Sequence, residues 1–257
     1  MSIITLTTDF GSGSPYVAEM KGVILSICPE ATVVDVTHEV PRGDVRQGAL
    51  VLRRVTSAFP DGAFHVAVVD PGVGTERRIL FARLGRQCFV APDNGLLSAV
   101  AQHASPRSFI ELTRRQFWRA DVSATFHGRD IMAPVAAHLA AGVAPEQRGR
   151  PINDPLTLDW PMAHCEPGRI TGEVVSVDRF GNLASNIAGD MLPADAALSV
   201  SCGGRRAVGL SRSYAPHGRG SLIALIGSDG CLELAVSDGN AAKTLGVGLG
   251  AAVEVTW

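Results

Sequence analysis

Short apolar segments alternate with helical segments along the first 70 residues, and this alternation strongly restricts the folds open to the chain. Segments with strand character cover residues 3–9, 31–37 and 63–70. Segments with helical character lie between them, over residues 14–28 and 43–59. The strand segments are almost continuously apolar, as is typical of strands that helices cover on both faces. The order β-α-β-α-β therefore predicts an α/β fold with a helix-flanked, mainly parallel sheet.

Polar residues mark the starts of the predicted helices. Ser14 is placed to cap the first helix, with Pro15 at its first position, and Asp44 lies near the start of the second. Farther along, "RILFARL" and "CFVAPDNGLLSAVA" predict a hairpin followed by a loop and a helix. Residues 128–142 predict another helix that ends at a glycine.

The composition and pattern of the sequence change after residue 145. Prolines recur through residues 146–168, which we interpret as a linker. Short strand segments separated by turn residues follow to the end of the chain, a spacing typical of an all-β barrel or sandwich. The sequence thus predicts an N-terminal α/β domain over residues 1–145 and a C-terminal all-β domain over residues 169–257.

Composition argues against several classes of protein. The formal net charge is -2, so no basic surface suggests a nucleic-acid partner. No apolar run approaches the roughly 20 residues that cross a bilayer, and the N-terminus lacks the features of a signal peptide. The five cysteines are scattered and form no CxxC pair, which argues against a disulfide framework or a cysteine zinc site. We therefore expect a cytoplasmic protein with no membrane or nucleic-acid partner.

Three loops follow the predicted parallel strands, where α/β proteins bind ligands. In the first, Gly11-Ser12-Gly13 precedes a helix, but Tyr16 breaks the GxGxxG pattern and no GK[ST] follows. A flexible turn is an equal alternative to a nucleotide loop. Asp9, at the strand end, is suited to accept the hydroxyls of a ribose.

The second and third loops also carry polar residues. His38 and Glu39 resemble a ligand pair, but no second cluster supports a metal site, and a capped loop is favoured. In the third loop, "DPGVGTERR", a phosphate site is disfavoured because Asp70 would face the anion. A hairpin turn at Pro71-Gly72 and a catalytic acid beside a cation both remain open.

Polar residues also gather in two later segments. "TFHGRDIMAP" places His127 where a loop meets a helix, beside other polar residues. "VDRFGNLASNI" places Asp178, Phe180 and Asn182 around a turn, which is either a plain hairpin or a surface for a planar ligand such as a purine. The turn "GSDGCLELAV" can likewise offer backbone groups to a base edge.

Seven motifs occur in order: "TDFG…Y…MKG", "HEVP.GD", "VVDPGVGT.RR", "APDNGLLS", "TFHGRD.MAP", "D.FGN…NI" and "GS.G.LE.AV..GNAA". On these motifs, which span Thr8 to Ala242, the chain resembles the S-adenosylmethionine (SAM) hydroxide adenosyltransferases, the hydrolase branch of the fluorinase and chlorinase superfamily. The resemblance implies an N-terminal α/β domain and a C-terminal β-barrel. It also implies a homotrimer that holds its ligand between the N-terminal domain of one subunit and the C-terminal domain of a neighbour.

The resemblance implies that water or hydroxide attacks C5′ of SAM in line and releases adenosine and L-methionine, without a cofactor. It implies that Asp70, Arg77 and His127 are the catalytic residues. A sulfonium is already a good leaving group, so the site has to aim a water and receive its proton. Asp70 can accept a hydrogen bond from that water, Arg77 can hold the carboxylate, and His127 can orient the water or relay the proton.

The resemblance also implies substrate-binding residues. Asp9 matches a carboxylate that binds the ribose, and Asp178 matches one near the methionine amino group. Phe180 and Asn182 match residues that stack on the adenine and hold the methionine end. The segment that meets the methionine carboxylate and the adenine edge corresponds to Ser228, Glu233 and Ala235. The chain departs from the family pattern at Asp229 and Cys231, where larger residues are expected.

Other functions remain open at this point. A SAM-dependent halogenase uses the same scaffold, but the carboxylate of Asp70 would repel a halide nucleophile. A non-catalytic SAM- or adenosine-binding protein would bind without turnover. A methyltransferase lacks support, because the glycine-rich nucleotide fingerprint is missing.

Overall fold

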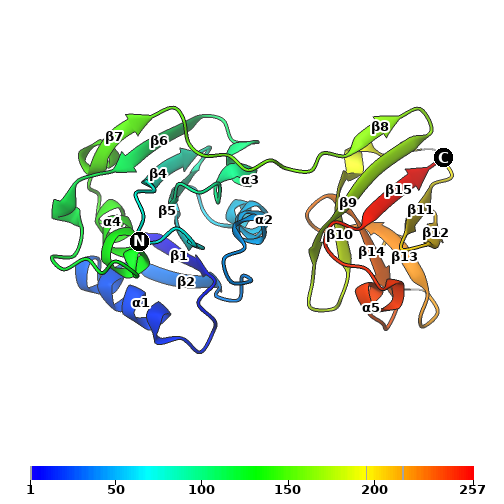
Figure 1. Ribbon diagram of the computed structural model, residues 1–257, viewed down its shortest axis with the longest axis horizontal. Coiled ribbons are helices and arrows are strands. Elements are labelled where there is room, and N and C mark those ends of the chain that lie inside the picture. The colour runs from blue at the N-terminus through cyan, green and yellow to red at the C-terminus, as the bar shows by residue number, and fades with distance from the viewer. Residues whose placement is uncertain (1, 195, 216) are drawn as a thin grey trace. The chain divides into compact units, whose positions relative to one another are not determined.

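The computed structural model describes residues 2–194, 196–215 and 217–257. The chain divides into two compact units, Met1–Leu158 and Asp159–Trp257 (Figure 1). The division lies inside residues 146–168, which the sequence predicts as a linker. Part of that stretch is regular structure, because β7 (Gly149–Ile152) is a strand of the first unit's sheet.

The sheet of the first unit mixes parallel and antiparallel strands. Besides β7, its strands are β1 (Ile3–Thr8), β2 (Thr32–Thr37), β3 (Phe64–Val68), β4 (Ile79–Leu84), β5 (Gln87–Pro92) and β6 (Arg107–Leu112). In the described part of the chain, they form a seven-stranded sheet in the order β2-β1-β3-β5-β4-β6-β7. The pairs β1–β2, β1–β3 and β3–β5 are parallel, whereas β4–β5, β4–β6 and β6–β7 are antiparallel. The prediction of a mainly parallel sheet is therefore not confirmed, because β4 and β5 join through a tight turn that reverses the chain instead of a crossover helix.

The helices of the first unit begin where the sequence predicts caps. They are α1 (Pro15–Ile27), α2 (Val45–Val55), α3 (Ser98–Ala101) and α4 (Ala133–Ala140). The Ser14 side chain accepts a hydrogen bond from the backbone N–H of Tyr16, and Asp44 accepts one from Gln47 at 2.9 Å. Among the residues described, no helix is both long and apolar enough to cross a membrane.

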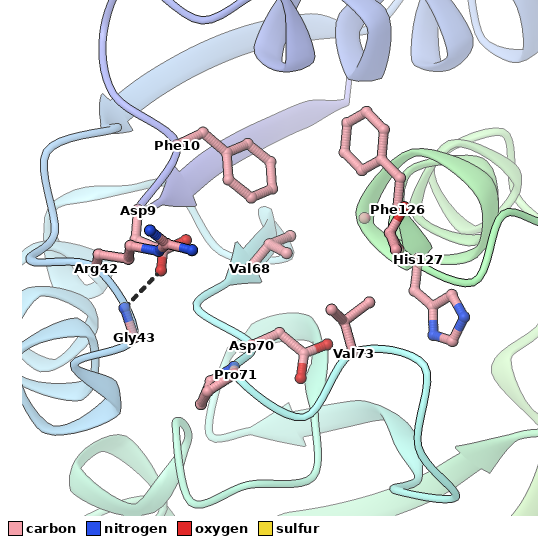
Figure 2. A pocket seen from close by; sticks show the side chains of 12 residues that line it. Asp9, Phe10, Arg42, Gly43, Val68, Asp70, Pro71, Val73, Phe126 and His127 are labelled. Carbon is pink, nitrogen blue, oxygen red and sulfur yellow. Dashed lines mark hydrogen bonds between the residues drawn. The ribbon is translucent and has the colours of Figure 1, made fainter.

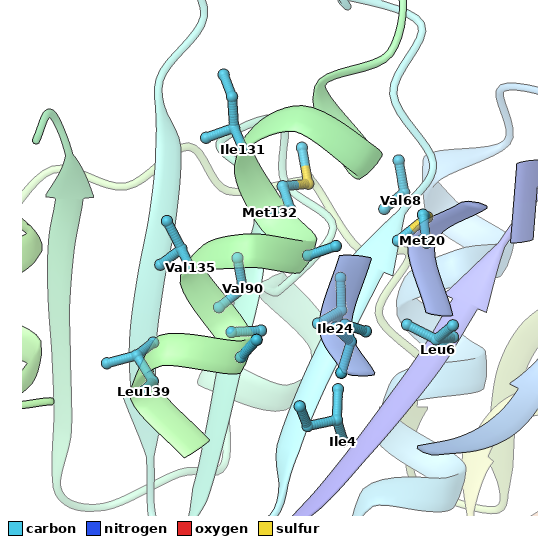
Figure 3. Packing of buried hydrophobic residues seen from close by; sticks show 14 of the residues in the cluster. Ile4, Leu6, Met20, Ile24, Val68, Val90, Ile131, Met132, Val135 and Leu139 are labelled. Atoms are coloured by element: carbon cyan, nitrogen blue, oxygen red, sulfur yellow. The ribbon is translucent and has the colours of Figure 1, made fainter. Parts of the chain in front are cut away.

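The core of the first unit lies between its sheet and the helices that cover it. Helices α1 and α4 pack on one face of the sheet, and α2 lies on the other (Figure 1). On the first face, apolar side chains of the strands and helices interdigitate. They include Ile4, Leu6, Met20, Ile24, Val68, Val90, Met132 and Val135 (Figure 3). A π-helical turn, Gly128–Met132, precedes α4. A Cβ on Gly128 would lie 3.3 Å from Val68 and 3.4 Å from the sulfur of Met20, so this turn packs directly on β3 and α1.

The second unit is a nearly closed antiparallel sheet. Its strands are β8 (His164–Glu166), β9 (Arg169–Val177), β10 (Leu183–Ala188), β11 (Ser199–Cys202), β12 (Arg205–Val208), β13 (Leu222–Ile226), β14 (Cys231–Val236) and β15 (Ala252–Thr256). The strand order is β12-β11-β15-β9-β10-β14-β13, with β8 paired to β9. A bridge from Ser211 to Leu225 brings the segment after β12 to β13, so the sheet resembles a barrel. This unit also contains a short α-helix, α5 (Ala241–Leu245), and a 3₁₀ turn, Gly189–Met191.

Candidate active site

A cavity of about 490 Å³ opens at the carboxyl ends of β1 and β3 in the first unit. Figure 2 shows residues of its wall, which come from the loop after β1, the segment before α2, the loop after β3 and the start of the π-helical turn. The cavity is lined by Asp9, Phe10, Arg42, Gly43, Val68, Asp70, Pro71, Val73, Thr125, Phe126, His127 and Gly128. Three of the residues predicted from the sequence, Asp9, Asp70 and His127, therefore share one cavity.

The glycine-rich loop after β3 brings Arg77 back to Asp70. Within the loop, the Thr75 hydroxyl donates to the carbonyl of Gly72 at 2.7 Å. Gly74 has a φ of +81°, and a Cβ there would lie 2.6 Å from the carbonyl oxygen of Ala124, so the turn requires glycine at this position. Arg77 Nε lies 2.9 and 2.8 Å from the two carboxylate oxygens of Asp70. Both side chains are nearly buried, at 9% and 4% exposure, so the loop is a tight turn that also pairs an acid with a cation.

His127 completes this cluster from the loop before the π-helical turn. Its Nδ1 lies 2.9 Å from Arg77 Nη2. A guanidinium can only donate hydrogen bonds, so Nδ1 is the acceptor and the neutral ring carries its proton on Nε2. Burial and the charge of Arg77 lower the pKa of His127, against the opposing effect of Asp70 and Asp130. His127 is therefore neutral near pH 7.

Asp130 holds the segment that carries His127. Its fully buried carboxylate accepts a hydrogen bond from the backbone N–H of Ser123 at 2.9 Å and pairs with Arg129 Nε at 2.7 Å. Arg119 also pairs with it, at 3.2 Å. The "GRD" part of the sequence motif thus fixes the loop in place, because a buried carboxylate is stable only when it is paired.

The loops after β1 and β2 are tied to each other beside Asp9. Glu39 accepts a hydrogen bond from the backbone N–H of Ser12 at 2.7 Å, and His38 Nδ1 lies 3.0 Å from the Thr8 hydroxyl. Asp9 Oδ2 accepts a hydrogen bond from the backbone N–H of Gly43 at 2.7 Å. The contacts of His38 and Glu39 are those of a capped loop. No cluster of three or more metal-ligating side chains occurs among the residues that the structure describes.

Sequence reasoning missed several residues of the cavity wall: Phe10, Arg42, Val73, Thr125 and Phe126. Phe10 and Phe126 stack edge to face at 5.7 Å between ring centroids. Both phenylalanines adjoin predicted site residues in the sequence, Asp9 and His127. That adjacency is the sequence signal that could have identified them as residues of the cavity wall.

Six predicted binding residues lie in the second unit. Asp178 Oδ1 accepts hydrogen bonds from the backbone N–H groups of Phe180 and Asn182, at 2.9 and 2.8 Å. Asn182 Nδ2 donates to the other carboxylate oxygen at 3.1 Å. Asp178 therefore stabilises the turn between β9 and β10. Phe180, at 75% exposure, projects from that turn into solvent.

The remaining predicted residues lie on or beside β14. Ser228 is in the turn that leads from β13 to β14, whereas Glu233 and Ala235 are on β14 itself. Glu233 Oε1 accepts a hydrogen bond from the Tyr214 hydroxyl at 2.7 Å, and Ala235 is buried. In the turn, Asp229 Oδ1 accepts a hydrogen bond from the backbone N–H of Cys231 at 3.2 Å.

Known protein families and individual proteins match nearly the whole chain. Residues 4–149 match the family model of the SAM hydroxide adenosyltransferase N-terminal domain, and residues 172–254 match that of the C-terminal domain. The chain is 43% identical to an (R)-S-adenosyl-L-methionine hydrolase from Salinispora tropica, over 98% of this chain and 97% of that protein. It is 30% identical to a fluorinase from an Actinoplanes species, over 72% of this chain and 71% of that one.

A solved structure agrees with these matches. A conserved protein from Thermotoga maritima, described as uncharacterized, superposes with a TM-score of 0.93 at 36% identity, covering 99% of this chain and all of that one. Both domain models match in order, and together they leave only the termini and a short intervening segment unmatched. The chain belongs to the SAM hydroxide adenosyltransferase family.

Proposed function

We propose that this protein hydrolyses S-adenosyl-L-methionine to adenosine and L-methionine. The observation that carries the proposal is the cluster of Asp70, Arg77 and His127 at the cavity described above. Relatives that carry the name (R)-S-adenosyl-L-methionine hydrolase support it, since the chain covers almost their full length.

The reaction places modest demands on the protein. A bond forms between a water oxygen and C5′, the C5′–S bond breaks, and one proton is released. The sulfonium leaves as a neutral thioether, so no acid has to protonate it and no metal or organic cofactor is required. The site has to hold the water in line with the C5′–S bond and accept a hydrogen bond from it.

The side chains of the cluster are suited to these tasks. Asp70 presents a carboxylate to the cavity and accepts the hydrogen bond of the attacking water. Arg77 fixes the orientation of that carboxylate through its planar fork. His127, whose Nδ1 is already occupied by Arg77, is a poor proton acceptor. We therefore assign it to orienting the cluster through Nδ1 and the water through its Nε2 proton.

Asp9 is suited to bind the ribose of the substrate. Its Oδ2 is engaged by Gly43, and its Oδ1 has no hydrogen-bond partner among the described residues. A ribose hydroxyl can donate to that oxygen. The cavity would then hold the nucleoside between Asp9 and Asp70, which both line it.

A halide nucleophile is the second candidate, because fluorinases are more distant relatives. The geometry disfavours it. A halide would have to approach the Asp70 carboxylate, and Arg77 Nε and Nη2 are already engaged by Asp70 and His127. Water, which both donates and accepts hydrogen bonds, suits this environment better.

The test is chromatography of the purified protein after incubation with SAM, with and without excess chloride. We expect adenosine and methionine in both samples. A 5′-chloro nucleoside that forms only with chloride would assign the halogenase activity instead. Bound SAM with no product would assign a binding protein.

The role of Asp70 is tested by Asp70→Asn, which keeps the shape of the side chain and removes its charge. We expect kcat to fall by about a hundredfold or more, because general-base and electrostatic contributions of this size are typical. SAM should still bind in calorimetry. The control is Asp61→Asn, which removes an exposed carboxylate that pairs with Arg86 away from the cavity. Equal kcat in the wild type and Asp70→Asn would remove Asp70 from the mechanism.

We also propose that the protein works as a homotrimer in the cytoplasm. The predicted binding residues are divided between two compact units, and Phe180 is a large aromatic side chain left exposed on the second. A neighbouring subunit can supply that surface to the cavity of the first unit. All five cysteines lie in described segments and are free thiols, which suits a reducing compartment.

A further inference from the structure

His38 is a buried histidine of the loop after β2, and its side chain connects the protein surface to the strand that leads into the cavity. It is 8% exposed. Its Nδ1 lies 3.0 Å from the hydroxyl of Thr8, the last residue of β1. Its Nε2 lies 3.1 Å from one carboxylate oxygen of Asp35, and the other oxygen accepts a hydrogen bond from Lys21 at 2.6 Å. The proposed mechanism uses none of these side chains.

The contacts of His38 define which atoms carry the protons. Burial acts to raise the pKa of Asp35, but the contacts with Lys21 and His38 outweigh it and lower the pKa, so the carboxylate is ionised. Because an ionised carboxylate only accepts, the ring proton that faces Asp35 lies on Nε2, and Nδ1 of the neutral ring is an acceptor. The Thr8 hydroxyl therefore donates to Nδ1. Its oxygen remains free to accept the backbone N–H of Phe10 at 3.3 Å.

Thr8 is placed to position the cavity wall and not to contact a ligand. Its side chain is fully buried, so no substrate atom can reach the hydroxyl. The next two residues, Asp9 and Phe10, line the cavity, and Figure 2 shows both side chains on this loop. Phe10 also contacts Phe126 and Tyr16 edge to face, at 5.7 and 5.9 Å between ring centroids. The orientation of Thr8 therefore affects where this side of the wall lies.

Backbone hydrogen bonds hold the course of the loop without the His38 side chain. The N–H of Gly11 donates to the carbonyl of His38 at 2.8 Å, and the N–H of Val40 donates to the carbonyl of Thr8 at 3.3 Å. Loss of the imidazole should therefore leave the two loops joined. What is lost is the acceptor of the Thr8 hydroxyl, and a buried hydroxyl without an acceptor favours another orientation of Thr8 and its neighbours.

We propose that His38 is a positioning residue for substrate binding: through the Thr8 hydroxyl it holds Asp9 and Phe10 in the orientation that receives the substrate. The identity of the substrate as SAM rests on the proposed function. Binding then does not have to order this part of the wall, which lowers the free-energy cost of binding. The proposed catalytic cluster stands on other loops and keeps its own contacts. His38 therefore acts on substrate affinity and not on the chemical step.

The experiment measures KM for SAM by steady-state kinetics and Kd for adenosine by calorimetry. His38→Ala and Thr8→Val should each raise both constants by about tenfold, the effect of losing one buried hydrogen bond, while kcat stays within about twofold of the wild type. The double variant should lose no more than either single variant, because both changes remove the same bond. His38→Asn should restore most of the affinity, because its side-chain oxygen can accept in place of Nδ1.

Thr5→Val is the matched control for Thr8→Val. Thr5 lies on the same strand, and its hydroxyl is 2.8 Å from Nδ1 of another buried histidine, His65. Neither residue belongs to the described residues that line the cavity. Thr5→Val should lower the melting temperature as Thr8→Val does, whereas KM for SAM and Kd for adenosine should stay at the wild-type values.

Two results would overturn the inference. Equal increases of KM and Kd in Thr5→Val and Thr8→Val would mean that general destabilisation causes them. Unchanged constants in both His38→Ala and Thr8→Val would mean that the backbone bonds alone hold the wall. The outcome is separable from the proposed function. A wild type that binds adenosine but leaves SAM intact contradicts hydrolysis alone, and the Kd values for adenosine still test His38. Hydrolysis with wild-type constants in both variants contradicts this inference alone.

Discussion

Arg77 connects the two other members of the cluster through one guanidinium. Its Nε contacts Asp70 and its Nη2 reaches His127 at 2.9 Å. The ammonium of a lysine is a single point of charge and cannot span both partners. We therefore predict that Arg77→Lys lowers kcat by about a hundredfold, an effect typical of losing one electrostatic contact, while KM for SAM changes little. Steady-state kinetics would measure both constants.

The adjacent arginine provides the matched control. Arg78 pairs with Asp93 at 2.7 Å and with Asp154 at 2.9 Å and does not line the cavity. Arg78→Lys should lower the melting temperature and leave kcat near the wild-type value. If both lysine variants lost the same share of kcat, the loss in Arg77→Lys would come from a general disturbance of the folded structure. It would not come from the contacts of Arg77 with Asp70 and His127.

The neutral state of His127 makes the reaction sensitive to acid. Its pKa is lowered from the ordinary value of 6.5, mainly by burial and then by Arg77. The neutral ring therefore persists to a more acidic pH than an exposed histidine would. As the pH falls through the lowered pKa, Nδ1 gains a proton and can no longer accept from Arg77. We predict that kcat/KM falls on the acid side, below pH 6.5.

The pH profile of His127→Asn identifies the titrating group. This variant has no ring to protonate, so the acid limb due to residue 127 should vanish while a lower, flatter activity remains. An unchanged acid limb would assign the titration to another group, and the contact between Arg77 and His127 would then be structural.

Individual candidate residues stood out where polar groups gather locally in the sequence, although the grouping of Asp70, Arg77 and His127 came from the family resemblance. Asp70 and Arg77 stand on either side of one glycine turn, and His127 stands at a helix start. Phe10 and Phe126 are marked only by their adjacency to Asp9 and His127, and Arg42 carries no signal, because a cavity wall depends on how separate loops pack together.

A glycine inside α2 shows how packing can override helix propensity. A Cβ on Gly48 would lie 2.7 Å from Leu96 Cδ1 and 3.1 Å from Val69 Cγ2. Alanine normally stabilises a helix interior by about 1 kcal/mol relative to glycine. Overpacking costs about 1–3 kcal/mol, so we predict that Gly48→Ala lowers the free energy of unfolding. Urea denaturation would measure the change.

Gly22 in α1 is the matched control for this prediction. It is exposed, and a Cβ there would meet no atom within 4 Å. Gly22→Ala should therefore raise the free energy of unfolding by about 0.5–1 kcal/mol, through propensity alone. A stabilising Gly48→Ala would show that Leu96 moves aside without cost.

The elements of the first unit were predictable from helix caps and apolar runs, but the mixed sheet was not. Ser14 and Asp44 mark the starts of α1 and α2 as expected. Strand direction depends on which neighbours pair, and β4 is inserted between β5 and β6. β7 was hidden in the proline-rich stretch, where Pro151 is tolerated because β7 is the edge strand. Pairing across such distances in sequence leaves no local pattern.

At the scale of the whole molecule, the proposed catalytic residues lie in one unit of the chain, whereas most of the proposed substrate contacts lie in the other. Asp70, Arg77 and His127 belong to Met1–Leu158, whereas Phe180 and Asn182 belong to Asp159–Trp257. If neighbouring subunits of a trimer share each site, two variants damaged in different units should complement each other. A subunit with an intact first unit would then meet a neighbour with an intact second unit.

We therefore predict that Asp70→Asn and a Phe180→Ala/Asn182→Ala double variant, each weakly active alone, recover activity when they are co-expressed. In a mixed trimer, one site combines the undamaged first unit of a Phe180→Ala/Asn182→Ala subunit with the undamaged second unit of an Asp70→Asn subunit. Turnover should therefore exceed the mean of the two pure variants. Sedimentation of the mixture checks that trimers have formed. Activity equal to that mean would place each site within a single subunit, and a stable, fully active monomer would contradict the trimer itself.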